Sequence, residues 1–429
     1  FFQAEDGIRY LVRSRGLGDV YKRQNYIITT MSTQIHDPIH GTVTITNIMK
    51  IIIDTPEFQR LRDLKQLGAS YFVFPSATHT RFEHSIGVSH LAGKLMETLQ
   101  KKQPRLKITA REIEVTRIAG LVHDIGHGPF SHLYDEYIRN AAEDEHEIRG
   151  CKIFQGMIRK YKIPLNAEDV TQICMMIDPD SKRKNHWPYQ IIANKMCQID
   201  VDKLDYIRRD CYHLGIEMTD TFSRIISNVR VVKTPGGNEV LGWPKKIEFD
   251  IFNMFASRYR LHKQVYNHHT VKSHEFVVIE ILKQLKQSIP KNLWQVTDAS
   301  IMCSLHPQFS GLIKKIQMRK TPKLVGELVV KLPHKSYHPE DPNPRRILNN
   351  IIQVTKIGFA GGNENPLTQV YYFTKEDKNM GYRGKPQDSS FCIPAQHQEL
   401  IVRMFTESSN LSQSKKEWKE IKRGWLVQK

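Results

Sequence analysis

The amino-acid sequence predicts a mostly α-helical protein with a smaller α+β region at its C-terminal end. Apolar residues recur at helical spacing from about residue 56 to 225 and again over 248–288. After Pro290 the pattern changes to short apolar segments that are typical of β-strands, separated by polar, Pro-containing loops. The apolar fraction of 40% is large enough for a sizeable core, which excludes a wholly disordered chain.

Apolar spacing and capping residues predict the first helices. One begins at Pro56 and ends near Gly68, with an apolar face of Phe58, Leu61, Leu64 and Leu67. A second covers residues 86–99. A third opens at the capping box formed by Thr109 and Glu112 and ends at the GHGP segment that follows it.

Towards the C-terminus we expect strands in GELVVKL (326–332), ILNNIIQVTKIGF (347–359) and QVYYFT (369–374). A last helix is expected near 397–406, before a Lys-rich tail from Ser408. The segment before Met31 lacks the apolar region of a signal peptide and resembles a translated sequencing-adapter read. These features divide the chain into a non-native leader (1–30), a helical domain (31–290), an α+β region (291–407) and a basic tail (408–429).

The composition excludes several classes of protein. No apolar run reaches the roughly 18–20 residues of a transmembrane helix. The six cysteines contain no CxxC pair, which argues against a structural zinc module or a disulfide scaffold and favours a reducing compartment. With no secretory or lipidation signal, the nucleus or the cytoplasm remain as locations. A net charge of +18 suits a polyanionic partner: a nucleotide, a nucleic acid or an acidic membrane surface.

Four segments carry candidate chemistry: RFEHS (81–85), HDIGHGPFSH (123–132), HE (146–147) and DKLDY (202–206). An adjacent His-Asp pair, joined by a distant His and a distant Asp, offers two nitrogen and two oxygen ligands. Such a set suits Zn, Fe, Mn or Ni, and Mg where phosphates and water add oxygens. Any one segment alone is more simply explained as a helix cap or a surface contact, and His123 and His127 could merely share a helical face. Their joint occurrence favours a metal site.

Longer motifs around these segments carry a family resemblance: DPIHG (37–41), KQLGASYFVFP (65–75), AGLVHDIGHGPFSH (119–132), IDVDKLDYIRRDCYHLGI (199–216) and MFASRYRLHKQVY (254–266). On these motifs the sequence resembles the HD-domain metal-dependent phosphohydrolases, and among them the deoxynucleoside triphosphate triphosphohydrolases that carry SAM and HD domains. The likeness covers most of residues 35–405 and thins towards the C-terminus. We expect no SAM domain, because the HD motifs begin close to the start of the chain.

The resemblance implies an HD-domain helical core over 31–290 that cleaves dNTPs to deoxynucleoside and triphosphate, and a regulatory or oligomerisation role for 291–407. The implied metal ligands are His84, His123, Asp124 and Asp202. His146 matches the active-site histidine, and the groups that line the phosphates and the leaving oxygen match His127, His132 and Asp135. Implied substrate contacts are Gln66, Leu67, Arg81, Lys203, Tyr206, Asp210, Arg258, Tyr266 and, where the family has Gln, Asn267.

The resemblance also implies allosteric activation by GTP and a dNTP, with assembly into a homotetramer. The residues that match the guanine-reading positions, which we expect on one helix leading to the substrate pocket, are Asp54, Gln59 and Arg62. Taken alone, they would be a helix cap and a solvated helix face. Thr33 and His36 replace a Lys and an Asn of the family there. A second, dNTP effector site retains Arg230, Lys246, Arg319 and Lys323 but departs from the family at Pro244, Asp250 and His269.

Two other functions are compatible with the sequence. The basic surface could bind single-stranded nucleic acid, although no aromatic-interleaved RNA motif accompanies the Lys and Arg runs. An HD phosphodiesterase acting on other nucleotides is the second, and the retained Arg81, Lys203 and Arg258 favour a triphosphate substrate over it.

Overall fold

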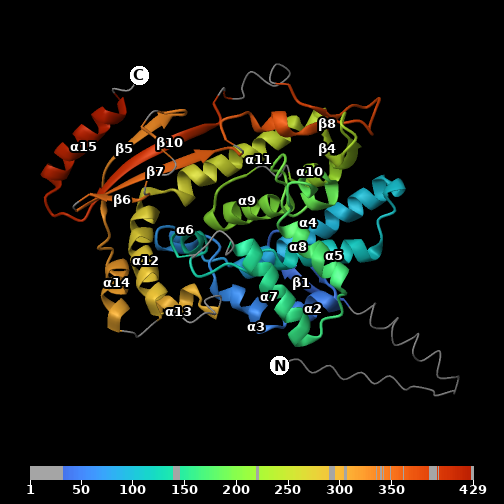
Figure 1. Ribbon diagram of the computed structural model, residues 1–429, viewed down its shortest axis with the longest axis horizontal. Coiled ribbons are helices and arrows are strands. Elements are labelled where there is room, and N and C mark those ends of the chain that lie inside the picture. Colours follow the sequence, from blue (N-terminus) through green and yellow to red (C-terminus); the bar gives the residue numbers. More distant parts are fainter. Residues whose placement is uncertain are drawn as a thin grey trace.

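The computed structural model describes residues 32–138, 145–218, 222–288, 295–303, 307–334, 336–338, 341, 343–347, 349–360, 362–385, 394 and 396–426. The expected leader over 1–30 and the expected domain boundary at 290/291 lie outside these residues. The fold is mostly α-helical with a smaller sheet-containing C-terminal region, as the sequence predicts (Figure 1). Among the described helices, none combines the length and apolar character needed to cross a membrane.

The helical region is built around α4 (Arg81–Lys102), which packs against α5 (Ala110–Val122) and α9 (Val201–Leu214). The predicted capping box at Thr109 and Glu112 is confirmed, and α4 begins with a second one at Thr80 and Glu83. The start of α4 matters for the site, because the motif residues Arg81 and His84 lie in its first turn. The other helices of this region are α2 (Asn47–Ile53), α3 (Pro56–Gln59), α6 (His132–Tyr137), α7 (His146–Tyr161), α8 (Ala167–Ile177), α10 (Phe222–Asn228), α11 (Glu248–Leu261) and α12 (His269–Ser288).

The helix expected from Pro56 to Gly68 is shorter than predicted. The α-helical part ends at Gln59, and a 3-10 turn over Arg60–Asp63 follows it. Beyond that turn the backbone pairs with a distant segment, since Arg81 N donates to Leu64 O at 3.0 Å and Gln66 N donates to His79 O at 3.0 Å. Tertiary hydrogen bonds thus replace the local helical bonds that apolar spacing alone would predict.

The prediction of a helix near 397–406 is wrong, because this segment forms strand β10 (Gln398–Thr406). It lies in the antiparallel sheet β5-β10-β7-β6, made with β5 (Lys323–Lys331), β6 (Arg345–Ile347) and β7 (Asn350–Gly358). Leu400, Val402 and Met404 pack with Trp418 of helix α15 (Leu411–Leu426), whereas Phe405 packs on the opposite face with residues of α12. Both faces are covered, so the strand is buried from Leu400 to Thr406 and carries no alternating pattern.

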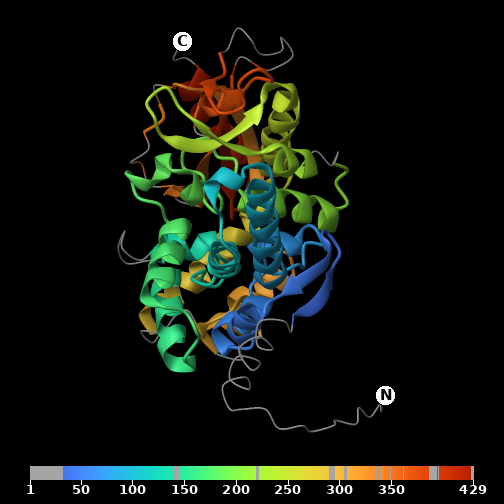
Figure 2. The same cartoon turned by 90° about the vertical axis from the view of Figure 1, so that its right-hand side faces the viewer.

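The expected tail over 408–429 contains helix α15 (Leu411–Leu426), which lies on the outer side of this sheet (Figure 1). A second sheet has the order β3-β4-β8-β9 and unites strands far apart in the sequence: β3 (Arg230–Lys233), β4 (Glu239–Pro244), β8 (Tyr371–Phe373) and β9 (Tyr382–Arg383). A hairpin of β1 (Thr33–Asp37) and β2 (Gly41–Ile45) precedes the helices. Figure 2 shows the C-terminal strands stacked above the helical region. The sequence patterns did not predict β1 to β4.

Candidate metal centre and active site

The four expected metal ligands converge at the junction of α4, α5 and α9. His84 lies in the first turn of α4, His123 at the end of α5 with Asp124 after it, and Asp202 in the first turn of α9. His84 Nε2 is 3.1 Å from Asp202 Oδ1 and 3.6 Å from Asp124 Oδ2, while His123 Nε2 is 3.3 Å from Asp124 Oδ1 and 3.6 Å from Asp202 Oδ1. The Asp202 side chain is 32% exposed and the other three 10% or less, so the centre opens on the Asp202 side.

The two histidine rings present the same nitrogen to this centre. His84 Nδ1 is 2.8 Å from Asp205 Oδ2, and His123 Nδ1 is 2.8 Å from the Gly120 carbonyl oxygen. Each contact holds an Nδ1–H and leaves Nε2 facing the carboxylates, which is the usual orientation of metal-ligating histidines. His123 Nε2 is buried and makes no hydrogen bond. This donor set of two imidazoles and two carboxylates fits a divalent metal ion.

Electrostatics within the cluster keep both carboxylates charged. Burial lowers the pKa of His84, but hydrogen bonds to Asp202 and Asp205 outweigh it and raise that pKa to about 10. Burial raises the pKa of Asp124, whereas Arg81 and the neighbouring histidines lower it further, to well below its usual range. The centre therefore gathers negative charge that a divalent cation would neutralise in competition with protons on the imidazoles.

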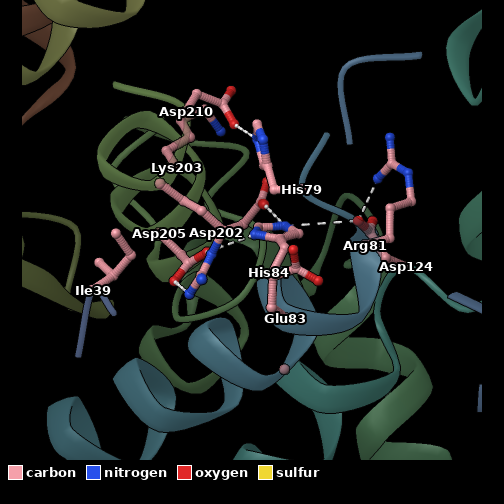
Figure 3. Close-up of polar contacts among 12 residues, drawn as sticks. Ile39, His79, Arg81, Glu83, His84, Asp124, Asp202, Lys203, Asp205 and Asp210 are labelled. Atoms are coloured by element: carbon pink, nitrogen blue, oxygen red, sulfur yellow. Dashed lines mark hydrogen bonds and ion pairs between the residues drawn. The ribbon is translucent and has the colours of Figure 1, made fainter. Parts of the chain in front are cut away.

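Behind His84 lies a buried network that fixes its ring. Arg209 donates from Nε to Asp205 Oδ2 at 2.8 Å and from Nη1 to Asp37 Oδ2 at 2.9 Å, and His40 Nε2 lies 2.6 Å from Asp205 Oδ1. Figure 3 shows His84 linked to Asp205 and Asp202 on one side and to Asp124 on the other.

Gly87, one turn after His84, makes room for this network. A Cβ at that position would collide with the carboxylate of Asp205 and the guanidinium of Arg209. The α4 backbone can therefore approach α9 closely only with glycine here.

A second group of histidines lies beside the metal centre. His127 stacks on His146 with ring centroids 3.9 Å apart, and His132 meets His127 edge-on at 5.6 Å. Asp135 joins them, since its Oδ2 is 2.9 Å from His146 Nδ1 and its Oδ1 accepts a 2.6 Å hydrogen bond from Arg149 Nη2. Desolvation by the surrounding residues and the positive charges of Arg81 and His146 lower the pKa of His132, although its side chain is exposed to solvent. The structure thus brings together all four residues that the resemblance assigns to the reacting groups.

Several expected substrate residues border the two clusters. Arg81 donates from Nε to Ser131 Oγ at 2.7 Å and forms an ion pair with Asp124. Lys203 Nζ lies 2.8 Å from Asp200 Oδ2. Both carboxylate oxygens of Asp210 have a partner: Oδ1 lies 2.7 Å from His79 Nε2, and Oδ2 accepts a hydrogen bond from the Tyr266 hydroxyl. The ring of His213 stacks on that of His79.

Other expected contacts are engaged elsewhere. Arg258 Nη1 donates to the carbonyl oxygens of Gly358 and Phe359, both at 3.0 Å. Asn267 is buried, and its Nδ2 donates back to His262 O at 3.0 Å. Gln66 and Leu67 lie on the segment that pairs with the backbone of His79. Gln66 Oε1 is buried there without a hydrogen-bond partner. Tyr206 is half-buried on α9, near Lys203 and Arg258.

The three expected guanine-reading residues do not share one helix, and that expectation is wrong. Asp54 ends α2, Gln59 ends α3 and Arg62 lies in the 3-10 turn, because Thr55 and Pro56 start a new helix between the first two. Gln59 and Arg62 are nevertheless joined by a 2.8 Å hydrogen bond from Arg62 Nε to Gln59 Oε1.

The four residues of the expected second effector site form two groups. Arg230 and Lys246 lie near Lys102, whose pKa is lowered by burial and by these two cations. Arg319, which follows α14 (Pro307–Gln317), and Lys323, at the start of β5, lie on the opposite side of the molecule from β4 (Figure 1). One chain therefore does not unite all four.

Sequence reasoning assigned no role to several residues that complete the site. Asp205 contacts His84 and lies three residues after the motif residue Asp202. Arg149 donates to Asp135 and lies three residues after the motif residue His146. That spacing, which places side chains on one helical face, could have indicated them. Nothing in the sequence links Ser131 to Arg81 or His79 to Asp210, because these contacts depend on how the helices pack.

Comparison with known proteins agrees with this geometry. The family model of the HD domain matches residues 81–207, which contain all four expected metal ligands. The chain is 33% identical over 411 residues to the deoxynucleoside triphosphate triphosphohydrolase SAMHD1 homolog of Dictyostelium discoideum, covering 90% of this chain and 79% of that protein. It is 32% identical over 439 residues to SAMHD1 of Gallus gallus (86% and 71% covered) and 30% identical over 462 residues to SAMHD1 of Homo sapiens (91% and 74% covered).

Fold and site together define an enzyme of the HD-domain phosphohydrolase class. More narrowly, the chain belongs to the SAMHD1 family of deoxynucleoside triphosphate triphosphohydrolases.

Proposed function

We propose that this protein hydrolyses dNTPs at the α-phosphorus and releases a deoxynucleoside and intact triphosphate. The observation that carries the proposal is the convergence of His84, His123, Asp124 and Asp202, with both Nε2 atoms facing the two carboxylates. When bound there, a divalent ion (Zn, Fe, Mn or Mg) supplies positive charge and lowers the pKa of water.

Residues around this centre suit a triphosphate. A triphosphate carries about four negative charges, and Arg81 and Lys203 offer cationic donors within the site. Asp210, whose two carboxylate oxygens contact His79 and the Tyr266 hydroxyl, is expected on the sugar side of the substrate. Gln66 and Leu67, on the segment that pairs with His79, are expected to contact the sugar and the base of the substrate.

Two histidines are candidates to protonate the departing 5′ oxygen. His146 is oriented by Asp135 through its Nδ1, which leaves Nε2 free. The pKa of His132 is lowered in the free protein, and the negative charge of a bound triphosphate would raise it again. Replacing each by Asn and comparing the pH dependence of kcat separates them: the true acid is the one whose loss removes the alkaline limb.

The experiment that tests the activity is product analysis. Purified protein, loaded in turn with Zn, Fe, Mn or Mg, is incubated with dGTP, dATP, cyclic nucleotide or single-stranded DNA. Deoxynucleoside and tripolyphosphate in equal amounts support the proposal. Pyrophosphate or orthophosphate from dNTPs, or hydrolysis of the cyclic nucleotide alone, would indicate another HD phosphodiesterase, and DNA binding without turnover a nucleic-acid-binding protein.

We further propose activation by GTP and a dNTP coupled to assembly of a homotetramer. Arg62, with its guanidinium 3.5 Å above the Phe82 ring, and the exposed carboxylate of Asp54 suit the donor and acceptor edges of guanine. Arg230, Lys246 and Lys102 lie close enough for the first two to lower the pKa of Lys102, and such a group of cations suits an anion. Since Arg319 and Lys323 lie elsewhere, a site that contains all four needs a second copy of the chain. Nuclear or cytoplasmic location stays a prediction.

A further inference from the structure

One carboxylate outside the HD motifs joins two segments of the site. Asp298 is the first residue of α13 (Asp298–Met302) and is 3% exposed. Thr297 already caps this helix, because its side chain accepts from Ser300 N. The carboxylate of Asp298 is thus free to accept two backbone hydrogen bonds from elsewhere: Phe130 N donates to Oδ1 at 2.6 Å, and Lys65 N donates to Oδ2 at 2.9 Å.

Both bonded segments carry expected substrate residues. Lys65 directly precedes Gln66 and Leu67, and Phe130 lies two residues before His132. Phe130 and Ser131 have positive φ angles of 54° and 50°, a conformation that is unfavourable for a residue other than glycine. Such a backbone persists only where its surroundings hold it. Ser131 in turn accepts the hydrogen bond from Arg81 Nε.

We propose that Asp298 is a positioning residue for the hydrolysis, which clamps the Lys65–Leu67 segment to the Phe130–His132 turn and so fixes Arg81 and His132 for the substrate. The inference rests on the proposed function, because it concerns residues of that same site. Its distinctive feature is that the clamp comes from beyond the HD motifs, 168 residues after Phe130 and 233 after Lys65. The C-terminal region would then influence the reaction through the side chain of Asp298, in addition to the bonds that its carbonyls make with Arg258.

Protonation of the clamp gives the proposal a pH signature. Burial raises the pKa of Asp298 to about 6, against the lowering effect of the two backbone hydrogen bonds, Arg81 and Lys65; Arg60 and Tyr71 also lie in its electrostatic reach. Below pH 6 one oxygen carries a proton and the clamp weakens. The pKa of Asp298 in the folded protein exceeds the unfolded value of about 3.9, so ionisation of this carboxyl group lowers the stability of the fold as the pH rises. Acid therefore weakens the two hydrogen bonds of the clamp, while the protonated carboxyl group itself does not reduce the stability of the fold.

The test compares Asp298→Asn with a matched control. Asparagine has the same shape as aspartate but only one acceptor oxygen. Its NH2 group would face one of the two backbone donors, Phe130 N or Lys65 N, so that one of the two hydrogen bonds is lost. Asp169→Asn serves as the control, since Asp169 is also a buried carboxylate in a first helical turn that accepts a backbone hydrogen bond, but far from the site. We expect Asp298→Asn to lower kcat for dATP at least tenfold at pH 8, and Asp169→Asn to stay within about twofold.

Two further readouts separate positioning from a general loss of structure. The ratio of wild-type to Asp298→Asn activity should shrink below pH 6, where the wild-type side chain is protonated and resembles the amide. Hydrogen exchange, corrected for intrinsic rates, should speed up in peptides that span 64–68 and 128–132 in the variant, and in wild type below pH 6 relative to pH 8. The wild-type measurement decides the matter even where the variant does not fold.

Equal kcat for wild type and Asp298→Asn, or unchanged exchange in both peptides, would overturn the clamp. A wild-type protein that releases no triphosphate would overturn the proposed function instead, and the exchange data would still decide whether Asp298 holds the two segments.

Discussion

At the scale of single residues, the site divides into groups that the sequence identifies and groups that only packing reveals. The metal-ligand set could be predicted because its four members stand in recognisable motifs of fixed residue type. The spacing from Asp202 could indicate that Asp205 lies on the same helical face, but not which group it contacts, since it becomes a partner of His84 only when α4 and α9 pack at Gly87. Asp298 is further removed, because its role depends on a contact across 168 residues.

Asp202→Ala should abolish hydrolysis while leaving the fold intact. The change removes one of two carboxylates from the centre, and the large core buried elsewhere does not depend on it for folding. We expect turnover below about a tenth of wild type at saturating metal, with the melting temperature shifted by no more than a few degrees. Asp178→Ala, which removes an exposed ion pair with Lys195, is the control. Wild-type turnover in the Asp202 variant would show that the centre is misassigned.

Asp205→Asn should weaken metal retention rather than substrate binding. Asp205 holds the Nδ1–H of His84, and loss of such a partner typically lowers metal affinity about 10- to 100-fold. Metal content after dialysis against a graded series of chelator concentrations measures the effect. Asp169→Asn, another buried carboxylate paired with an arginine, should retain metal as wild type does. Identical chelator curves for the two variants would remove Asp205 from the metal site.

At the scale of elements, short-range patterns predicted the start of α5 and the strands β5, β7 and β8, but they missed β1 to β4 and mistook β10 for a helix. Capping boxes fixed the starts of α4 and α5, because their hydrogen bonds are local. Strand β10 was mistaken for a helix because α15 covers one face and α12 the other, which removes the alternation that marks a half-exposed strand. Its identity depends on α15, an element that the sequence patterns treated as a tail.

Trp418→Ala should therefore destabilise the C-terminal sheet. Trp418 is 8% exposed and packs with Leu400, Val402 and Met404 of β10. Truncating a buried tryptophan typically costs about 3–5 kcal/mol. Urea unfolding followed by far-UV circular dichroism measures the loss, and Leu411→Ala, at a side chain 40% exposed, should stay near wild type. Equal midpoints for the two variants would mean that α15 does not dock on the sheet.

At the scale of the whole molecule, the proposed regulation requires more than one chain. Arg230 and Lys246 lie on one side and Arg319 and Lys323 on the other, so the proposed second effector site would need a second copy of the chain to unite all four. The proposed first effector site would draw on three short elements, of which Gln59 and Arg62 are already joined. Sequence alone could not show this division, because it depends on where α14 and β4 lie in the fold.

GTP, but not ATP, should drive oligomerisation and raise dATP hydrolysis. The Asp54 carboxylate can accept from guanine N1–H and the 2-amino group, a pattern that adenine does not offer, and the mismatch should cost roughly 2–4 kcal/mol. Sedimentation velocity and dATP turnover, with GTP and with ATP, measure both effects in wild type and in Asp54→Ala. Full activity without any nucleotide effector, or an equal response to ATP, would leave a constitutive enzyme.

The central claim is that His84, His123, Asp124 and Asp202 direct water to the α-phosphorus of a dNTP. The most direct measurement is hydrolysis of dATP in water labelled with heavy oxygen, followed by mass spectrometry of both products. We expect one labelled oxygen in the triphosphate and none in the deoxyadenosine. Label in orthophosphate, pyrophosphate or dAMP, or in the 5′ hydroxyl of deoxyadenosine, would contradict the account.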